Sequence, residues 1–208
     1  MQTLFYFWGM KKYSLLFVVM CLSVFAHAQS FHLGVKAGVN QGSLTKAPNL
    51  GGPNTTTSFV CGVFAKLGAA GLFVQPEVLY SQRNGVFSDS TNQTVTNELH
   101  YIDVPILVGY KLTALRFYAG PNFQFLLAAN QKAPTSLKDP FFSKDNFNSA
   151  SIGYQIGIGL NLQKIVLDVR YDGSIGDLGK TINTATGKSV NYSTRSNMWQ
   201  FTIGYRII

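Results

Sequence analysis

The stretch Ser151-Ile152-Gly153-Tyr154-Gln155-Ile156-Gly157-Ile158-Gly159-Leu160-Asn161-Leu162 decides the fold. Every even position carries a large apolar side chain, and every odd position carries glycine or a small polar residue. Such alternation is typical of a β-strand with two different faces, because successive side chains of a strand point to opposite sides. We therefore predict a strand over 151–162.

Seven further segments repeat this alternation, so the chain is predicted to be all-β. They are 31–40, 59–67, 72–81, 101–110, 115–125, 165–172 and 198–207. The short connections lie at 68–71, 111–114 and 161–164, and the long polar ones at about 41–57, 83–98, 129–149 and 173–196. Short turns at one end and long loops at the other are the layout of an outer-membrane β-barrel. We predict an eight-stranded antiparallel transmembrane up-and-down β-barrel with four long extracellular loops and both termini at the periplasmic end.

The composition fits this architecture better than that of an ordinary soluble domain. Only 12% of the 208 residues are charged, which is about half the fraction usual in soluble proteins. The high apolar content argues against disorder. Nine of the 20 glycines lie on the polar faces of the predicted strands. Glycine suits the narrow interior of an eight-stranded barrel, so we predict that the apolar face contacts lipid. A soluble barrel of lipocalin type, with its apolar face inward, is the alternative.

Aromatic and proline residues refine the expected barrel. Aromatic girdles mark both membrane interfaces of such barrels, and five outward residues near strand ends are candidates. They are Tyr80, Tyr110, Tyr171, Trp199 and Tyr205. Proline removes a ladder hydrogen bond and usually marks an edge or a bulge. A closed barrel has no edge, so we expect bulges near Pro76, Pro105 and Pro121.

The N-terminus has the pattern of a secretory signal peptide. Lys11-Lys12 precede an apolar run over 13–25, and Ala26-His27-Ala28 forms a small-residue cleavage site. We interpret Met10 as the true start and predict a signal peptide over 1–28 and a barrel domain over 29–208. Cleavage removes two lysines and lowers the formal charge from +8 to +6. The remaining cysteine, Cys61, lies in an alternating segment and is expected to act as a small apolar residue.

Several short segments, taken in order, resemble a known family. They are Leu33–Asn40, Gln75–Ser81, Tyr101–Val108, Tyr118–Pro121 and Ile203–Arg206. In this order the chain resembles the PorT-like outer-membrane β-barrel proteins of Bacteroidetes. The resemblance implies an outer-membrane location in a Gram-negative cell envelope and the barrel fold. Most members of that family have no established activity, and a few are linked to secretion of other proteins. The chain departs from the usual barrel pattern by ending in Ile208 instead of an aromatic residue, and Tyr205 is the expected substitute.

Charged residues on the polar face form the candidate site. They are Lys36, Glu77, Asp103, Arg116, Asp168, Arg170 and Arg206. Isolated charges are costly in a narrow interior, so we expect them to pair into a salt-bridge and hydrogen-bond core that fills the barrel. A gated ion path or a small-ligand site is the alternative.

Catalytic residues are not predicted. Only His32 and His100 remain after signal cleavage, and His100 has Glu98 two residues away. No G-x-S-x-G motif and no metal-ligand spacing accompanies them. We therefore expect neither a metal nor a cofactor, and a lipid-modifying enzyme is the third functional alternative.

The excess positive charge is assigned to loops and rims. The residues are Lys46, Arg83, Lys132, Lys138, Lys144, Lys180, Lys188 and Arg195. We expect these loops to attract the phosphates of lipopolysaccharide.

Outer-membrane lipid, lipopolysaccharide and other envelope proteins are the expected partners, and nucleic acid is not. The predicted function is a non-enzymatic structural or interaction role, with a narrow pore or secretion accessory as the alternative. Hairpins in 129–149 or 173–196 are candidates for adhesion by strand addition.

Overall fold

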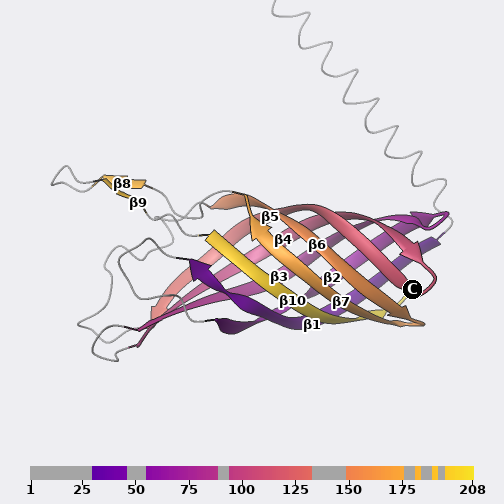
Figure 1. Ribbon diagram of the computed structural model, residues 1–208, viewed down its shortest axis with the longest axis horizontal. Helices are drawn as coiled ribbons and strands as arrows, with labels where there is room; N and C mark the ends of the chain where they lie inside the picture. Colours follow the sequence, from indigo (N-terminus) through magenta and orange to yellow (C-terminus); the bar gives the residue numbers. More distant parts are fainter. Residues whose placement is uncertain are drawn as a thin grey trace, which may run out of the picture.

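The computed structural model describes residues 30–45, 55–88, 94–132, 149–175, 181–183, 189–191 and 195–208. Its main body is one closed antiparallel sheet (Figure 1). The barrel strands are β1 (Ser30–Thr45), β2 (Thr56–Ala69), β3 (Leu72–Ser88), β4 (Thr94–Leu112), β5 (Leu115–Lys132), β6 (Ala150–Leu162), β7 (Ile165–Ser174) and β10 (Arg195–Arg206). The predicted eight-stranded barrel is confirmed. The predicted signal peptide lies outside the described residues.

Pairing of the first and last barrel strands closes the sheet. β1 pairs with β10 from Gly34↔Arg206 to Thr45↔Arg195, and the neighbour order is β1-β10-β7-β6-β5-β4-β3-β2. Closure leaves no free edge, so backbone groups bond within the wall, as a chain in hydrocarbon requires. A separate pair, β8 (Thr181–Asn183) and β9 (Ser189–Asn191), lies beyond one end of the barrel (Figure 1).

The apolar face of the barrel points outward, as predicted. On β6, Ile156 is 56% exposed, whereas its neighbour Gln155 is 1% exposed. The same contrast runs around the wall, and the exposed set includes Val63, Val108, Ile158 and Ile203. Among the described residues, no helix is long and apolar enough to cross a membrane.

Outward aromatic side chains form contacts across neighbouring strands. The Tyr171 ring meets the Trp199 ring edge-on with centroids 5.4 Å apart, and it lies 6.3 Å from the Tyr154 ring. Near the opposite end, the Lys164 ammonium lies 5.9 Å from the Tyr205 ring centroid. These positions match the two interfacial belts that such barrels carry.

Three two-residue turns lie at one end of the barrel, which we call the turn end. They are 70–71, 113–114 and 163–164, in agreement with the predicted short connections. Backbone hydrogen bonds of 2.8 Å join them to adjacent strands, such as Lys111 N–H to Gly71 O and Arg206 N–H to Lys164 O. The first turn has positive φ at both Ala70 and Gly71, as the tightest hairpins require. The C-terminus lies at this end too (Figure 1).

The strands extend further into the predicted loops than the sequence pattern indicates. β3 runs to Ser88 and β4 starts at Thr94, and the ladder continues to the pair Ser88↔Thr94. β1 and β5 likewise continue to Thr45 and Lys132. The predicted loop bounds are therefore wrong at 41–45, 56–57, 83–88, 94–98, 129–132, 173–174 and 195–196. The sequence there loses its regular alternation of apolar and polar residues, although the strand pairing continues.

The bulges expected at three prolines are absent. Across Pro76, Pro105 and Pro121 the strand register is the same before and after each proline. In one ladder, each proline instead loses its own pairing, and the residue before it loses its pairing too, because proline has no N–H to donate. The register shift that does occur in the described ladders lies between His100 and Tyr101, where β5 contributes an extra residue, Leu127.

Candidate functional site

Charged and polar side chains fill the barrel from wall to wall. We call the group nearer the turn end the inner cluster. Its members are Lys36, Gln75, Glu77, Arg116, Tyr118, Asp168 and Arg170. The Lys36 Nζ lies 2.7 Å from Glu77 Oε1 and 3.3 Å from Asp168 Oδ2. Arg170 binds Glu77 at 2.9 Å and lies 3.5 Å from Asp168, while Arg116 binds the other oxygen of Asp168. Three cations thus share two carboxylates.

Neutral donors and aromatic rings complete the inner cluster. Gln75 donates to Glu77 and accepts from Arg116 at 2.8 Å. The Tyr118 hydroxyl donates to Asp168 at 2.9 Å, and the Arg116 and Arg170 guanidinium carbons lie 5.4 and 5.3 Å from the Tyr118 ring centroid. Desolvated cations gain from such contacts with ring faces.

The outer cluster lies nearer the loop end and has the opposite charge balance. It consists of Arg83, Asp103, Asn122, Gln124 and Asp172. A single Arg83 nitrogen donates to both Asp103 oxygens, at 2.9 and 3.1 Å. Asp172 lies 3.8 Å from that nitrogen and accepts from Asn122 and Gln124 at 2.9 and 3.3 Å. One cation here faces two carboxylates.

Gln155 joins the two clusters into one network. It accepts from Arg170 at 3.0 Å and donates to Asp172 at 2.7 Å. The two clusters together hold four cations and four anions. The network of the two clusters is therefore neutral, which satisfies the requirement that its buried charges be paired and hydrogen-bonded.

Glycines on the inward face make room for this network. A Cβ atom at Gly159 would meet the Arg116 side chain and the Asp168 carboxylate, and one at Gly157 would meet Tyr118. The glycine content noted in the sequence thus lets bulky inward side chains lie across a narrow barrel.

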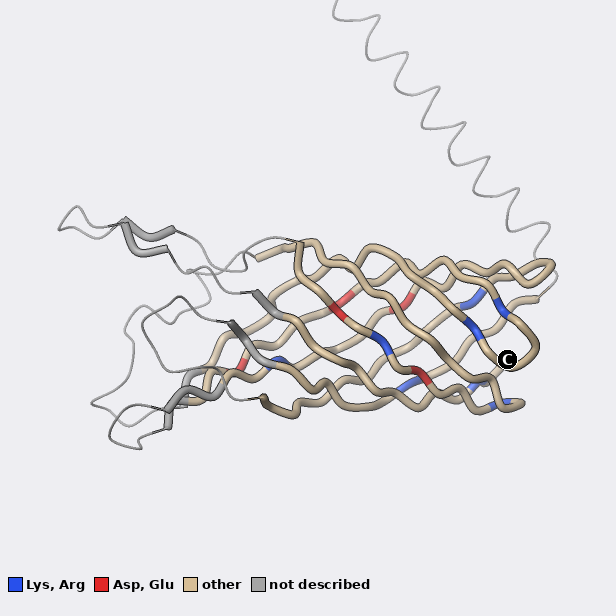
Figure 2. The backbone as a smooth tube through the Cα atoms, in the orientation of Figure 1, with Lys and Arg blue, Asp and Glu red and all other residues tan. Residues whose placement is uncertain are grey.

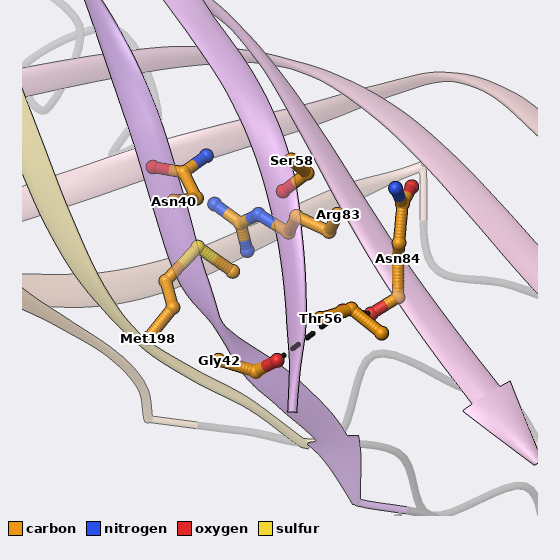
Figure 3. A pocket seen from close by; sticks show the side chains of 7 residues that line it. All are labelled: Asn40, Gly42, Thr56, Ser58, Arg83, Asn84 and Met198. Atoms are coloured by element: carbon orange, nitrogen blue, oxygen red, sulfur yellow. Dashed lines mark hydrogen bonds between the residues drawn. The ribbon is translucent and has the colours of Figure 1, made fainter. Parts of the chain in front are cut away.

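A small cavity lies between the side chains of the outer part of the lumen. The cavity in Figure 3 lies beside Arg83 and measures about 10 Å³. Asn40, Ser58, Asn84 and Met198 also line it. That volume is about enough for one water molecule.

The structure places six of the seven predicted core residues in the network. Lys36, Glu77, Asp103, Arg116, Asp168 and Arg170 are each at most 3% exposed. Arg206 is half-buried at the turn end and belongs to neither cluster. The prediction that Arg83 lies in a loop or rim is wrong, because its guanidinium is fully buried against Asp103. Asp172 was likewise outside the predicted set. Both continue the inward alternation of their strands, and that signal could have found them.

The two histidines lie at opposite ends of the barrel wall. His32 is half-buried at the turn end. The His100 Nδ1 lies 2.7 Å from the Tyr80 hydroxyl, and the two rings stack with centroids 5.9 Å apart. Within the described part of the chain, no group of three or more His, Cys, Asp and Glu residues is arranged to hold a metal ion.

An apolar exterior, a charged interior and short turns at one end define a small outer-membrane β-barrel protein. The chain belongs to the family described as "outer membrane protein beta-barrel domain", whose profile matches residues 27–179. The protein is located in the outer membrane. No curated protein matches the chain significantly.

Three solved structures illustrate what the chain is similar to. One is Ail, the attachment invasion locus protein of Yersinia pestis, solved with the heparin analogue sucrose octasulfate (13% identity, 86% of this chain and 100% of that chain, TM-score 0.48). Another is Neisserial surface protein A (14% identity, 84% and 96%, TM-score 0.49). A third is OprG of Pseudomonas aeruginosa (13% identity, 86% and 96%, TM-score 0.45).

Proposed function

We propose that this protein is a non-enzymatic outer-membrane barrel, closed by its own side chains, with a structural or interaction role at the cell envelope. The observation that carries the proposal is the neutral network of inner and outer clusters, which occupies the lumen. A network in which each carboxylate accepts two or more hydrogen bonds is stable without a ligand. Function is then left to the surfaces at the two ends of the barrel.

The filled lumen argues against the narrow-pore alternative. An ion path needs a continuous water-filled channel, whereas the cavity beside Arg83 measures only about 10 Å³. Arg83, Arg116 and Arg170 are among the largest fully buried side chains and lie across the lumen. Their ion pairs hold them there.

We also propose that the chain is a PorT-like protein of Bacteroidetes. Its interaction role would then be that of an accessory in the secretion of other proteins. Three of the resembling segments lie on the neighbouring strands β3, β4 and β5. Two of their prolines lie close together in the wall, because Pro76 pairs with Ile106 and Pro105 is the residue before Ile106. This part of the resemblance is therefore one local structural unit instead of three scattered matches.

We propose that the long loops contact lipopolysaccharide. Lys138 and Lys144 are the loop lysines on which this proposal rests, and both lie outside the described residues. Long-range attraction by loop lysines would favour anionic phosphates. Charge reversal at both lysines should weaken lipopolysaccharide association, and unchanged association would contradict this part of the proposal.

Single-channel recording in planar bilayers tests the closed interior. We expect negligible current from the purified barrel, with a porin recorded in parallel as the positive control. A steady ion-selective conductance that Glu77→Gln abolishes would contradict the closed interior and favour the pore.

A further inference from the structure

A second cavity opens at the turn end, below the inner cluster. It measures about 300 Å³ and is lined by residues of β1, β2, β3 and β4. We call it the periplasmic mouth, because short turns of outer-membrane barrels face the periplasm. Its lining includes His32, Lys66, Phe73 and Lys111, together with backbone around the Ala70-Gly71 turn.

Lys66 is the unusual residue of the periplasmic mouth. Its side chain is directed inward and the residue is only 6% exposed. Its ammonium lies 4.5 Å from the Phe73 ring centroid. Among the described residues no carboxylate forms an ion pair with it, and the acids of the inner cluster are held by Lys36, Arg116 and Arg170. A buried ammonium without an anion is costly, and a ring face offsets only part of that cost.

Most groups around Lys66 add positive charge, and the carboxylate that acts on it, Asp168 of the inner cluster, is bound by Lys36 and Arg116. His32 and Lys111 share the cavity lining. Arg206 is half-buried on the same end of the wall, and its Nε has no hydrogen-bond partner among the described residues. Figure 2 shows Lys and Arg gathered at the end that carries the C-terminus, with Asp and Glu lying further along the barrel.

We propose that the periplasmic mouth binds a phosphate group. A 300 Å³ cavity accommodates a phosphate with part of a larger molecule, and an anion there would supply the counter-charge that Lys66 lacks. Phosphate is favoured over a monocarboxylate because it carries more charge and more acceptor oxygens for several converging cations. Lys66 and Lys111 provide point charges, and His32 provides a ring N–H. The phosphate belongs to a soluble periplasmic molecule or to a lipid headgroup.

Calorimetric titration of the full-length purified barrel tests the site. The protein is held in dodecyl maltoside, which contains no phosphate, and is titrated with inorganic phosphate in one arm and dihexanoyl phosphatidic acid in the other. We expect saturable binding in at least one arm, weakened about tenfold or more by Lys66→Gln, since a hydrogen bond to a charged group has roughly that value. Lys164→Gln is the matched control, because it removes the same charge at the same end but on the Tyr205 side of the wall, outside the cavity lining.

Each outcome decides the proposal. Binding of inorganic phosphate identifies a soluble ligand, and binding of the short-chain lipid alone identifies a headgroup. Absence of binding in both arms overturns the proposal. Equal loss in Lys66→Gln and Lys164→Gln also overturns it, because general attraction to a basic rim would then be sufficient.

A second measurement separates a binding residue from a structural one. Without phosphate, Lys66→Met should unfold at the same or a higher urea concentration than the parent, because the variant lacks an unpaired buried charge. The same variant should show no stabilisation when the ligand that bound in the titration (inorganic phosphate or dihexanoyl phosphatidic acid) is added, whereas the parent should. A marked loss of stability in Lys66→Met without phosphate would show that the lysine serves the fold and would overturn the assignment.

Discussion

Arg83 shows how the charge balance of the interior depends on a single side chain. The sequence pattern placed it in a loop, because the apolar face of its strand stops alternating after Tyr80. Its inward parity nevertheless continues through Ser81, Arg83 and Gly85. Without Arg83 the core would hold three cations and four anions. Inward parity is thus the signal that could have found this residue from the sequence.

We expect Arg83→Met to destabilise the barrel by about 3–5 kcal/mol, because it leaves Asp103 buried without a cation. Asp103 is completely buried, and Arg83 binds both of its oxygens. Urea unfolding in lipid vesicles, followed by the difference in gel mobility of folded and unfolded barrel, measures the change.

The double variant Arg83→Met with Asp103→Asn is the control for this prediction. It removes the pair together, so the cost should be smaller than the sum of the single variants by about 1 kcal/mol or more. Strictly additive costs would mean that the two side chains act independently and that the ion pair does not stabilise the outer cluster.

At the scale of strands, the prolines interrupt three successive interfaces of the wall. The missing N–H groups of Pro76, Pro105 and Pro121 leave gaps in the β2–β3, β3–β4 and β4–β5 ladders. The pairings on both sides of each gap keep the register, so the closed barrel absorbs a lost hydrogen bond without an inserted residue. The expectation of bulges assumed that a proline must displace its strand.

Pro76→Val should stabilise the barrel by about 1 kcal/mol, the value of one added backbone hydrogen bond. The unchanged register places the new N–H opposite Ala65 of β2, and Pro76 faces outward, so the core is untouched. Urea unfolding in vesicles measures the gain. Val78→Ile, on the outward face of the same strand, should change stability by less than about 0.5 kcal/mol. Destabilisation by Pro76→Val would show that the fixed proline geometry is needed at this gap.

The central part of each strand was predictable from the sequence, and the strand ends were not. Residues 151–162 alternate because lipid lies on one side and a filled lumen on the other, and β6 covers almost the same range. Beyond the alternating segments the ladder continues to the pair Ser88↔Thr94, which the sequence pattern does not predict. The bulge at Leu127 was also missed, because an inserted apolar residue leaves the sequence equally hydrophobic on both sides. The sequence pattern predicted six of the eight charges of the two clusters, but not which acid each cation binds.

For the whole molecule, the even number of barrel strands fixes the orientation of every surface discussed above. β1 starts and β10 ends at the turn end, so the mouth around Lys66 and the predicted loops face opposite compartments. Outer-membrane barrels have short turns in the periplasm and long loops outside. The proposed phosphate site and the proposed lipopolysaccharide contact therefore require one specific orientation.

Labelling of single cysteines in intact cells tests that orientation. In a Cys61→Ala background, a membrane-impermeant maleimide should label Lys138→Cys, in the predicted loop 129–149, on intact cells. Ala114→Cys, in the turn between β4 and β5, should be labelled only after the outer membrane is permeabilised. Removing Cys61 is necessary because it is the free thiol of the described chain and is half-buried in the wall. The reverse labelling pattern would place the basic mouth at the cell surface, where lipopolysaccharide phosphate instead of a periplasmic molecule would be the anion within reach of Lys66.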